Sequence, residues 1–85
     1  MPPTFNHVDT VAVIEAYPTG AIFRVHNPAG PIFSLSEVTC PWMMPIILTS
    51  TISNRPIEII YEGVGSGAPA PNGVPTALVI AIILK

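Results

Sequence analysis

Two histidines, His7 and His26, are the side chains from which proton-transfer or metal chemistry would have to start in this sequence. Asp9 lies two residues after His7, so on a β-strand both side chains would point to the same face and could share a metal ion. Two positions that alternate are a weak signal, because a metal site needs several converging ligands. We therefore expect solvated polar side chains at strand ends, with no metal site and no cofactor.

Nucleophilic catalysis has an equally weak basis in the sequence. Ser66 lies between Gly65 and Gly67, which repeats only the centre of the G-x-S-x-G motif and lacks the strand–turn–helix frame around it. The same glycine-rich segment is not followed by the lysine of a phosphate-binding loop. The sequence therefore predicts that the protein is not an enzyme.

Two phenylalanines, Phe23 and Phe33, fall on adjacent predicted strands, where they could stack on nucleic-acid bases or pack into a core. Nucleic-acid binding needs a basic surface, and the chain has three Lys and Arg residues in all, with a net charge of -2. Core packing is therefore the better interpretation, and we expect no nucleic-acid partner.

Charged residues make up only 9% of the 85 residues, whereas a typical soluble domain has about 25%. Hydrophobic residues make up 49%, so a lone chain cannot cover its surface with charge. Another copy of the same chain is the simplest cover for the excess apolar surface. The composition therefore predicts a homo-oligomer.

The ends of the chain and its one cysteine bear on where the protein works. The first ten residues have neither a basic nor an apolar signal region, and the longest apolar run, Ala77 to Leu84, is too short to span a membrane. We expect no signal peptide and no membrane-spanning segment. Cys40 alone excludes an internal disulfide framework and is compatible with a reducing compartment, which leaves the localisation open.

The chemistry-bearing residues must be positioned by short strands separated by proline- and glycine-rich turns. After an extended arm at residues 1–7, alternating apolar residues predict three strands, at 8–17, 21–26 and 32–37. Residues 42–52 are predicted as a short helix. Its apolar face would be Met44, Ile47, Leu48 and Ile52. A strand at residues 45–52 is the alternative, because that segment is rich in β-branched residues.

The segment Ser53–Pro56 joins this helix to the second half of the chain. Asn54 can adopt the left-handed conformation that ends a helix, and Pro56 prevents its continuation. A fourth strand at 57–62, a Gly/Pro-rich loop at 63–75 and a fifth strand at 76–84 follow. The order β-β-β-α-β-β predicts a mainly β protein, a single OB-like five-stranded barrel domain spanning residues 1–85.

The segment from Trp42 to Tyr61, WMMPIILTSTISNRPIEIIY, resembles the OB-fold B subunits of AB5-type toxins, in particular the subtilase-cytotoxin B-like group. In that group an apolar helix ends in a short polar turn and leads into a strand of alternating β-branched and polar residues. The resemblance implies a ring-forming barrel, usually a pentamer, that binds glycans.

The sequence thus predicts a non-catalytic, self-assembling binding module. Its candidate ligand face is Arg24, His26 and Tyr61, with a glycan as the expected ligand. Its candidate interface residues are Trp42, as a barrel-end plug or interface anchor, and Ile60, which lies between two glutamates on a predicted edge strand. The alternative is a purely structural subunit of a particle or filament that binds no small ligand.

Overall fold

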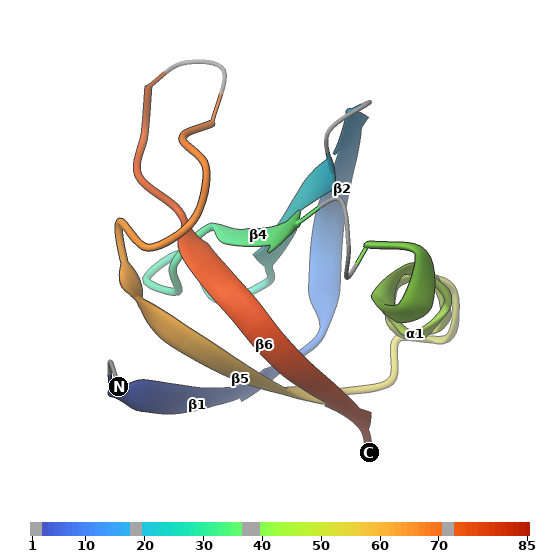
Figure 1. The fold of residues 1–85 in the computed structure, drawn as a ribbon. Coiled ribbons are helices and arrows are strands. Elements are labelled where there is room, and N and C mark those ends of the chain that lie inside the picture. Colours follow the sequence, from blue (N-terminus) through green and yellow to red (C-terminus); the bar gives the residue numbers. More distant parts are fainter. Residues whose placement is uncertain (1–2, 18–19, 37–39, 71–72) are drawn as a thin grey trace.

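The computed structural model describes residues 3–17, 20–36, 40–70 and 73–85 as a mainly β protein with one short helix (Figure 1). The elements are β1 (Thr4–Asp9), β2 (Val11–Tyr17), β3 (Gly20–Val25), β4 (Phe33–Ser36), α1 (Cys40–Ser53), β5 (Ile57–Val64) and β6 (Ala77–Leu84). The predicted fold class is therefore confirmed at the level of a small β domain with one helix, whereas the predicted number of five strands is wrong.

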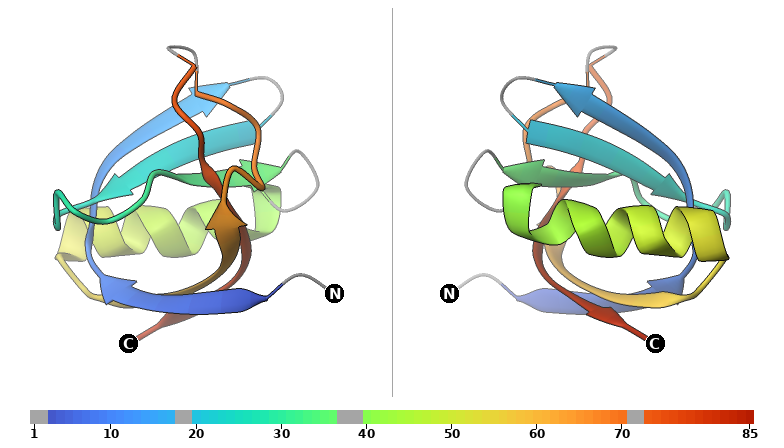
Figure 2. Two further views of the ribbon diagram at one scale, coloured as in Figure 1. Left: turned by 90° about the vertical axis from the view of Figure 1, so that its left-hand side faces the viewer. Right: turned by 90° about the vertical axis from the view of Figure 1, so that its right-hand side faces the viewer.

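The six strands form one open, mixed sheet in the order β1-β5-β6-β4-β3-β2. Every pair is antiparallel except β4 with β6, which is parallel. The two edge strands, β1 and β2, are consecutive in the chain with only Thr10 between them. The sheet therefore curls strongly and brings its two edges together at this residue (Figure 2). This curl encloses the core without hydrogen bonds that close the sheet into a barrel.

The predicted first strand, residues 8–17, is confirmed from Val11 onward, but its continuity is wrong, because the chain bends at Thr10 and residues 8–9 belong to β1. The backbone N–H of Thr10 donates to Asp9 Oδ1 at 2.8 Å, and its carbonyl accepts from the backbone N–H of His26 at 3.1 Å. The predicted extended arm is also wrong from residue 4 onward. Residues 4–9 pair with β5, which satisfies backbone groups that an isolated arm would leave to water.

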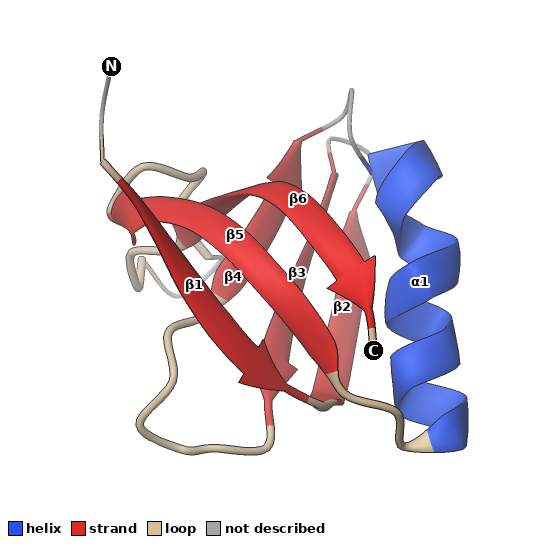
Figure 3. Cartoon of the chain, turned by 90° about the horizontal axis from the view of Figure 1, so that it is seen from below, coloured by secondary structure: helices blue, strands red, loops and turns tan. Residues whose placement is uncertain are grey.

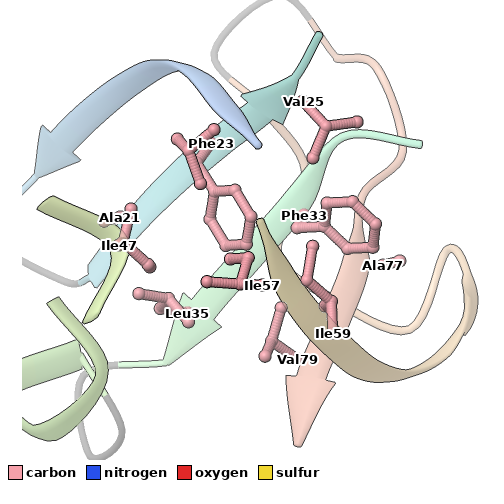
Figure 4. Close-up of a cluster of buried hydrophobic side chains, with 11 residues drawn as sticks. Ala21, Phe23, Val25, Phe33, Leu35, Ile47, Ile57, Ile59, Ala77 and Val79 are labelled. Atoms are coloured by element: carbon pink, nitrogen blue, oxygen red, sulfur yellow. The ribbon is translucent and has the colours of Figure 1, made fainter. Parts of the chain in front are cut away.

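The core is a cluster of eleven buried residues drawn from β2 to β6 and from α1, ten of which are labelled in Figure 4. The rings of Phe23 and Phe33 stack at its centre with their centroids 5.2 Å apart, and Tyr61 meets Phe33 edge-on at 5.0 Å. Both phenylalanines are essentially inaccessible to solvent. Their prediction as core residues rather than base-stacking residues is confirmed.

The segment 40–53 is helical, which settles the choice between helix and strand. Helix α1 lies across one open side of the curled sheet and contacts β2, β4 and β6 (Figure 2, right). Within α1, Ile47 and Ser50 are fully buried, whereas Leu48 is 44% and Ile52 81% exposed. The predicted apolar face is therefore wrong for these last two residues, because apolar residues are spread around α1 without a clear periodic stripe and its rotation is set by other contacts.

The joint after α1 has the predicted local structure. Asn54 has a φ of 55°, in the left-handed region, and the chain then enters β5 at Ile57. Ile57 and Ile59 are fully buried, as the alternating pattern predicts. The prediction of an edge strand is wrong, because β5 lies between β1 and β6. Strand β5 also runs on to Val64, so the following loop occupies residues 65–76 rather than 63–75.

Candidate functional site

The polar residues of the N-terminal half meet where β1 turns into β2. The carboxylate of Asp9 accepts hydrogen bonds from the backbone N–H of Thr10 at 2.8 Å and of Asn27 at 3.2 Å, and it lies 3.2 Å from His7 Nε2. The ring of His26 is hydrogen-bonded through Nδ1 to Thr10 Oγ1 at 2.5 Å. We call these five residues the β1–β2 corner.

The β1–β2 corner contains the residue types of a catalytic triad, but they are divided between two histidines. A triad needs one imidazole that contacts both the hydroxyl and the carboxylate. Here the hydroxyl of Thr10 contacts His26, whereas the carboxylate of Asp9 contacts His7. Among the described residues there is also no group of three His, Cys, Asp or Glu side chains that could hold a metal ion. The corner is therefore best explained as a polar clamp that ties the β1–β2 bend to the β3–β4 loop.

Asp9 carries the charge of this clamp. Partial burial of its carboxylate would by itself raise its pKa, but the hydrogen bonds from Thr10, His7 and Asn27, together with the nearby charge of His7, outweigh burial and hold the pKa of Asp9 below its usual value. A carboxylate with a lowered pKa in the folded protein stabilises the fold above its unfolded-state pKa, and this contribution is lost as the pH falls through the folded-state pKa.

We expect Asp9→Asn to lower the free energy of unfolding at pH 7 by about 1–2 kcal/mol, because it removes charge-assisted hydrogen bonds. The deficit should shrink toward pH 3, where the native carboxylate is itself becoming protonated. Urea unfolding at both pH values measures this. Glu62→Gln is the matched control, since Glu62 makes no hydrogen bond or ion pair within the described residues. An equal deficit at both pH values would show that Asp9 acts through shape rather than charge.

A cleft of about 490 Å³ opens between the β3–β4 loop and the β5–β6 loop, and we call it the loop cleft. Figure 1 shows these two loops on the left of the molecule, away from α1. Its wall combines the end of β3 and the β3–β4 loop with the end of β5 and residues 74–75. The lining residues used below are Arg24, Asn27, Ile32, Val64, Val74 and Pro75.

A smaller hollow of about 230 Å³ adjoins the loop cleft and shares Val64 with it. Phe5 from β1 and Tyr61 from β5 line it, with their ring centroids 5.8 Å apart. Phe5 is 46% exposed, whereas Tyr61 is half-buried because its other contact is the core residue Phe33. The hollow is an aromatic surface without a charged side chain in its lining.

The three residues of the predicted ligand face do not form one site. Arg24 lines the loop cleft and Tyr61 lines the smaller hollow, and Val64 is the residue that the two depressions share. His26 lines neither and belongs to the β1–β2 corner. Sequence reasoning missed Asn27 and Val74, although the Asn27–Pro28 turn and the Gly/Pro-rich loop were both visible as irregular segments that could gather around a ligand.

The two predicted interface residues lie on different faces of the molecule. Trp42, in the first turn of α1, is 81% exposed, so it is not the plug of a barrel end. Ile60 points away from the core on β5, between Asn6 of β1 and Ala81 of β6. Figure 3 shows strands β1, β5 and β6 toward the viewer and α1 along one side, so the two residues belong to separate surfaces.

Each of these surfaces exposes several large apolar side chains. The exposed residues Trp42, Pro45, Leu48 and Ile52 form what we call the α1 outer face. The helix also exposes the polar residues Thr51 and Ser53, but no residue of α1 is charged. The outer sheet face is centred on Val8, Ile60 and Ile83, where Val8 and Ile83 are 57% and 46% exposed. Its central carboxylate, Glu58, pairs with Lys85 Nζ at 2.9 Å and accepts from Asn6 at 2.6 Å.

The one helix of the described residues is too short to cross a membrane. Comparisons of the chain with protein-family models, with curated proteins and with solved structures found no significant match in any of the three.

Proposed function

We propose that this protein is non-catalytic and acts by self-association through the α1 outer face. The observation that carries the proposal is a fourteen-residue helix that contains no charged side chain and leaves Trp42 and Ile52 each 81% exposed. A surface helix of a soluble monomer normally carries polar residues on its outer side, and a helix that is apolar all round is normally buried. Tryptophan in such a surface is a frequent anchor of protein–protein contacts.

The presence of two different apolar faces favours a head-to-tail contact between copies. If the α1 outer face packs on the outer sheet face of the next copy, each subunit uses both of its faces, and the assembly is a ring or a filament. The pairing of Glu58 with Lys85 supports this geometry, because it neutralises the carboxylate at the centre of the outer sheet face. A pentameric ring is the form that the toxin resemblance favours.

We propose in addition that the fold is a variant of the OB-like barrel. If β1 and β2 are counted as one strand that bends at Thr10, the elements follow the order β-β-β-α-β-β with five strands. The curl of the sheet supports this relationship, since it brings both halves of that bent strand to the two edges. Glycan binding stays a prediction from the resemblance, which a glycan array tests directly. The structural-subunit alternative predicts no binding on that array.

We expect Trp42→Lys to weaken self-association at least tenfold, because a charge replaces the largest apolar contact of the α1 outer face; truncating a central interface residue typically costs about 2 kcal/mol or more. Sedimentation velocity between micromolar and submillimolar concentration measures the change. Ala29→Lys adds the same charge in the exposed β3–β4 loop and should leave the oligomer unchanged. A native chain that sediments as a 9.0 kDa monomer throughout this range would overturn the proposal.

Ile60→Lys separates the two possible geometries. A head-to-tail contact predicts that Ile60→Lys and Trp42→Lys both shift the oligomer toward monomer, with the far-UV circular dichroism of both variants retained. A contact between two α1 outer faces predicts that only Trp42→Lys has this effect, and it predicts dimers in place of rings or filaments. Electron micrographs of the native protein then distinguish closed rings from open filaments.

A further inference from the structure

We propose that the loop cleft is a binding site for a small monocarboxylate with an apolar body, held by Arg24. This inference does not depend on self-association, because the loop cleft is formed by the two loops that lie away from α1. The class of ligand assigned to Arg24 is inferred from the contacts that the described residues make.

Arg24 is the basic residue that the fold leaves unused. The chain has three Lys and Arg residues in all. Arg55 donates from Nε and Nη2 to the carbonyl of Lys85, and Lys85 Nζ pairs with Glu58. Arg24 is exposed, and no hydrogen bond or ion pair joins it to any residue that the structure describes. Its guanidinium is therefore available to an external anion.

Asn27 adds a second donor to the same cleft. Its side-chain Oδ1 already accepts the backbone N–H of Ala29 at 3.0 Å, whereas its amide NH₂ donates to no residue that the structure describes. Its backbone N–H is held by Asp9, which fixes the position of the residue. The side-chain groups of the lining that lack a partner among the described residues are thus donors, and they favour a ligand that presents acceptor oxygens.

The rest of the lining is apolar. Ile32 comes from the β3–β4 loop, Val64 from the end of β5, and Val74 and Pro75 from the β5–β6 loop. Val64 is 63% and Val74 38% exposed, so a ligand that covers them removes apolar surface from water. The volume of about 490 Å³ lies in the range of roughly 300–1,000 Å³ that is usual for small-molecule sites.

These features together select a carboxylate over other anions and over a neutral ligand. The planar guanidinium matches a carboxylate with two parallel hydrogen bonds, and one cation balances one negative charge. A phosphate dianion would keep an uncompensated charge, because the lining contains no second cation among the described residues. A neutral polyol could accept from the same donors, but it would not balance the positive charge of the guanidinium.

Titration followed by ¹H–¹⁵N NMR tests the site with benzoate, acetate and benzamide as probes. We expect saturable shifts of the amide signals of Asn27, Gly30, Val64 and Val74 with benzoate, at a Kd of roughly 0.1–1 mM, as suits one exposed ion pair and a small apolar contact. Acetate lacks the apolar body and benzamide lacks the charge, so each should bind at least tenfold more weakly.

Variants assign the affinity to Arg24. Arg24→Gln should weaken benzoate binding at least tenfold, and Arg24→Lys should weaken it less, because the charge is kept and the planar fork is lost. Lys85→Gln removes an equal charge outside the loop cleft and should change the Kd less than twofold. The spectrum of each variant without ligand shows whether it is folded, and Arg24→Lys keeps the test valid if Arg24→Gln does not fold.

The proposal is overturned by any of four results. These are the absence of saturable shifts with benzoate, equal affinity for benzoate and benzamide, equal losses from Lys85→Gln and Arg24→Gln, and shifts that map to the α1 outer face. Repeating the titration with Trp42→Lys keeps the two proposals distinguishable, because an intact benzoate site in a chain that never associates would refute self-association alone.

Discussion

Replacing Gly20 with alanine is expected to lower the free energy of unfolding by about 3–5 kcal/mol, which combines backbone strain with steric overlap. Gly20 begins β3 with a φ of +146°, a conformation that residues with a side chain rarely adopt. A Cβ at this position would lie 2.3 Å from the carbonyl oxygen of Leu35 on the neighbouring strand β4. Because that oxygen belongs to the backbone of a paired strand, it cannot move aside without disturbing the sheet.

Alanine substitutions at two other glycines distinguish the cost of backbone strain from the cost of steric overlap. Gly65→Ala introduces a side chain at a φ of +98° with no atom within 4 Å, so it should show the backbone cost alone. Gly63→Ala meets only the ring of Phe5 at 3.8 Å, an ordinary contact, and should be close to neutral. Urea unfolding followed by circular dichroism ranks the three variants. If Gly20→Ala were no less stable than Gly65→Ala, the close approach of β3 to β4 at Leu35 would be refuted.

Replacing Ser50 with alanine is expected to lower the free energy of unfolding by about 2–4 kcal/mol, because two backbone groups lose their partner at once. Ser50 is fully buried on the inner side of α1. Its Oγ accepts from the backbone N–H of Val11 at 3.1 Å and donates to the carbonyl of Arg55 at 2.7 Å. The hydroxyl thus joins the helix to the start of β2 and to the segment that leads into β5.

Thr51→Ala provides the control on the same helix. The Oγ1 of Thr51 donates to the carbonyl of Ile47 one turn earlier, and the residue is exposed, so its loss should cost less than about 0.5 kcal/mol. The chemical-denaturation midpoints of both variants measure the difference. A Ser50→Ala variant as stable as Thr51→Ala would show that the Val11 N–H finds another partner, and that Ser50 does not fix the rotation of α1.

The rotation of α1 illustrates what periodicity can and cannot predict. The sequence predicts the helix at residues 42–52 correctly, because the Ser53–Pro56 joint marks the end of the element. The predicted inward face is partly wrong, because the apolar residues of this helix are spread around its axis and carry little periodic signal. The helix is rotated so that Trp42 and Ile52 point outward and Ser50 is hydrogen-bonded to Val11 and Arg55. Hydrophobic periodicity does not predict these two hydrogen bonds.

The candidate sites are likewise predicted from the sequence only in part. Arg24 and Tyr61 were both named from the sequence as ligand-facing residues, and each lines a depression, but they line different ones. The loop cleft joins the β3–β4 loop to residues 64, 74 and 75, which lie more than thirty positions later in the chain. A contact over such a separation depends on which strands pair, and no local pattern encodes it.

The sequence by itself determined the local features of this protein: the turn at Asn54, the start of β5 at Ile57, the inward direction of Ile57 and Ile59, and the shortage of charge. These depend on a few adjacent residues whose backbone preferences and alternation act directly. Only the tertiary structure decided that β5 is an interior strand, that the chain bends at Thr10, and that β4 pairs in parallel with β6. Strand order follows from apolar burial summed over distant segments, and several orders of these short apolar strands satisfy the same local pattern.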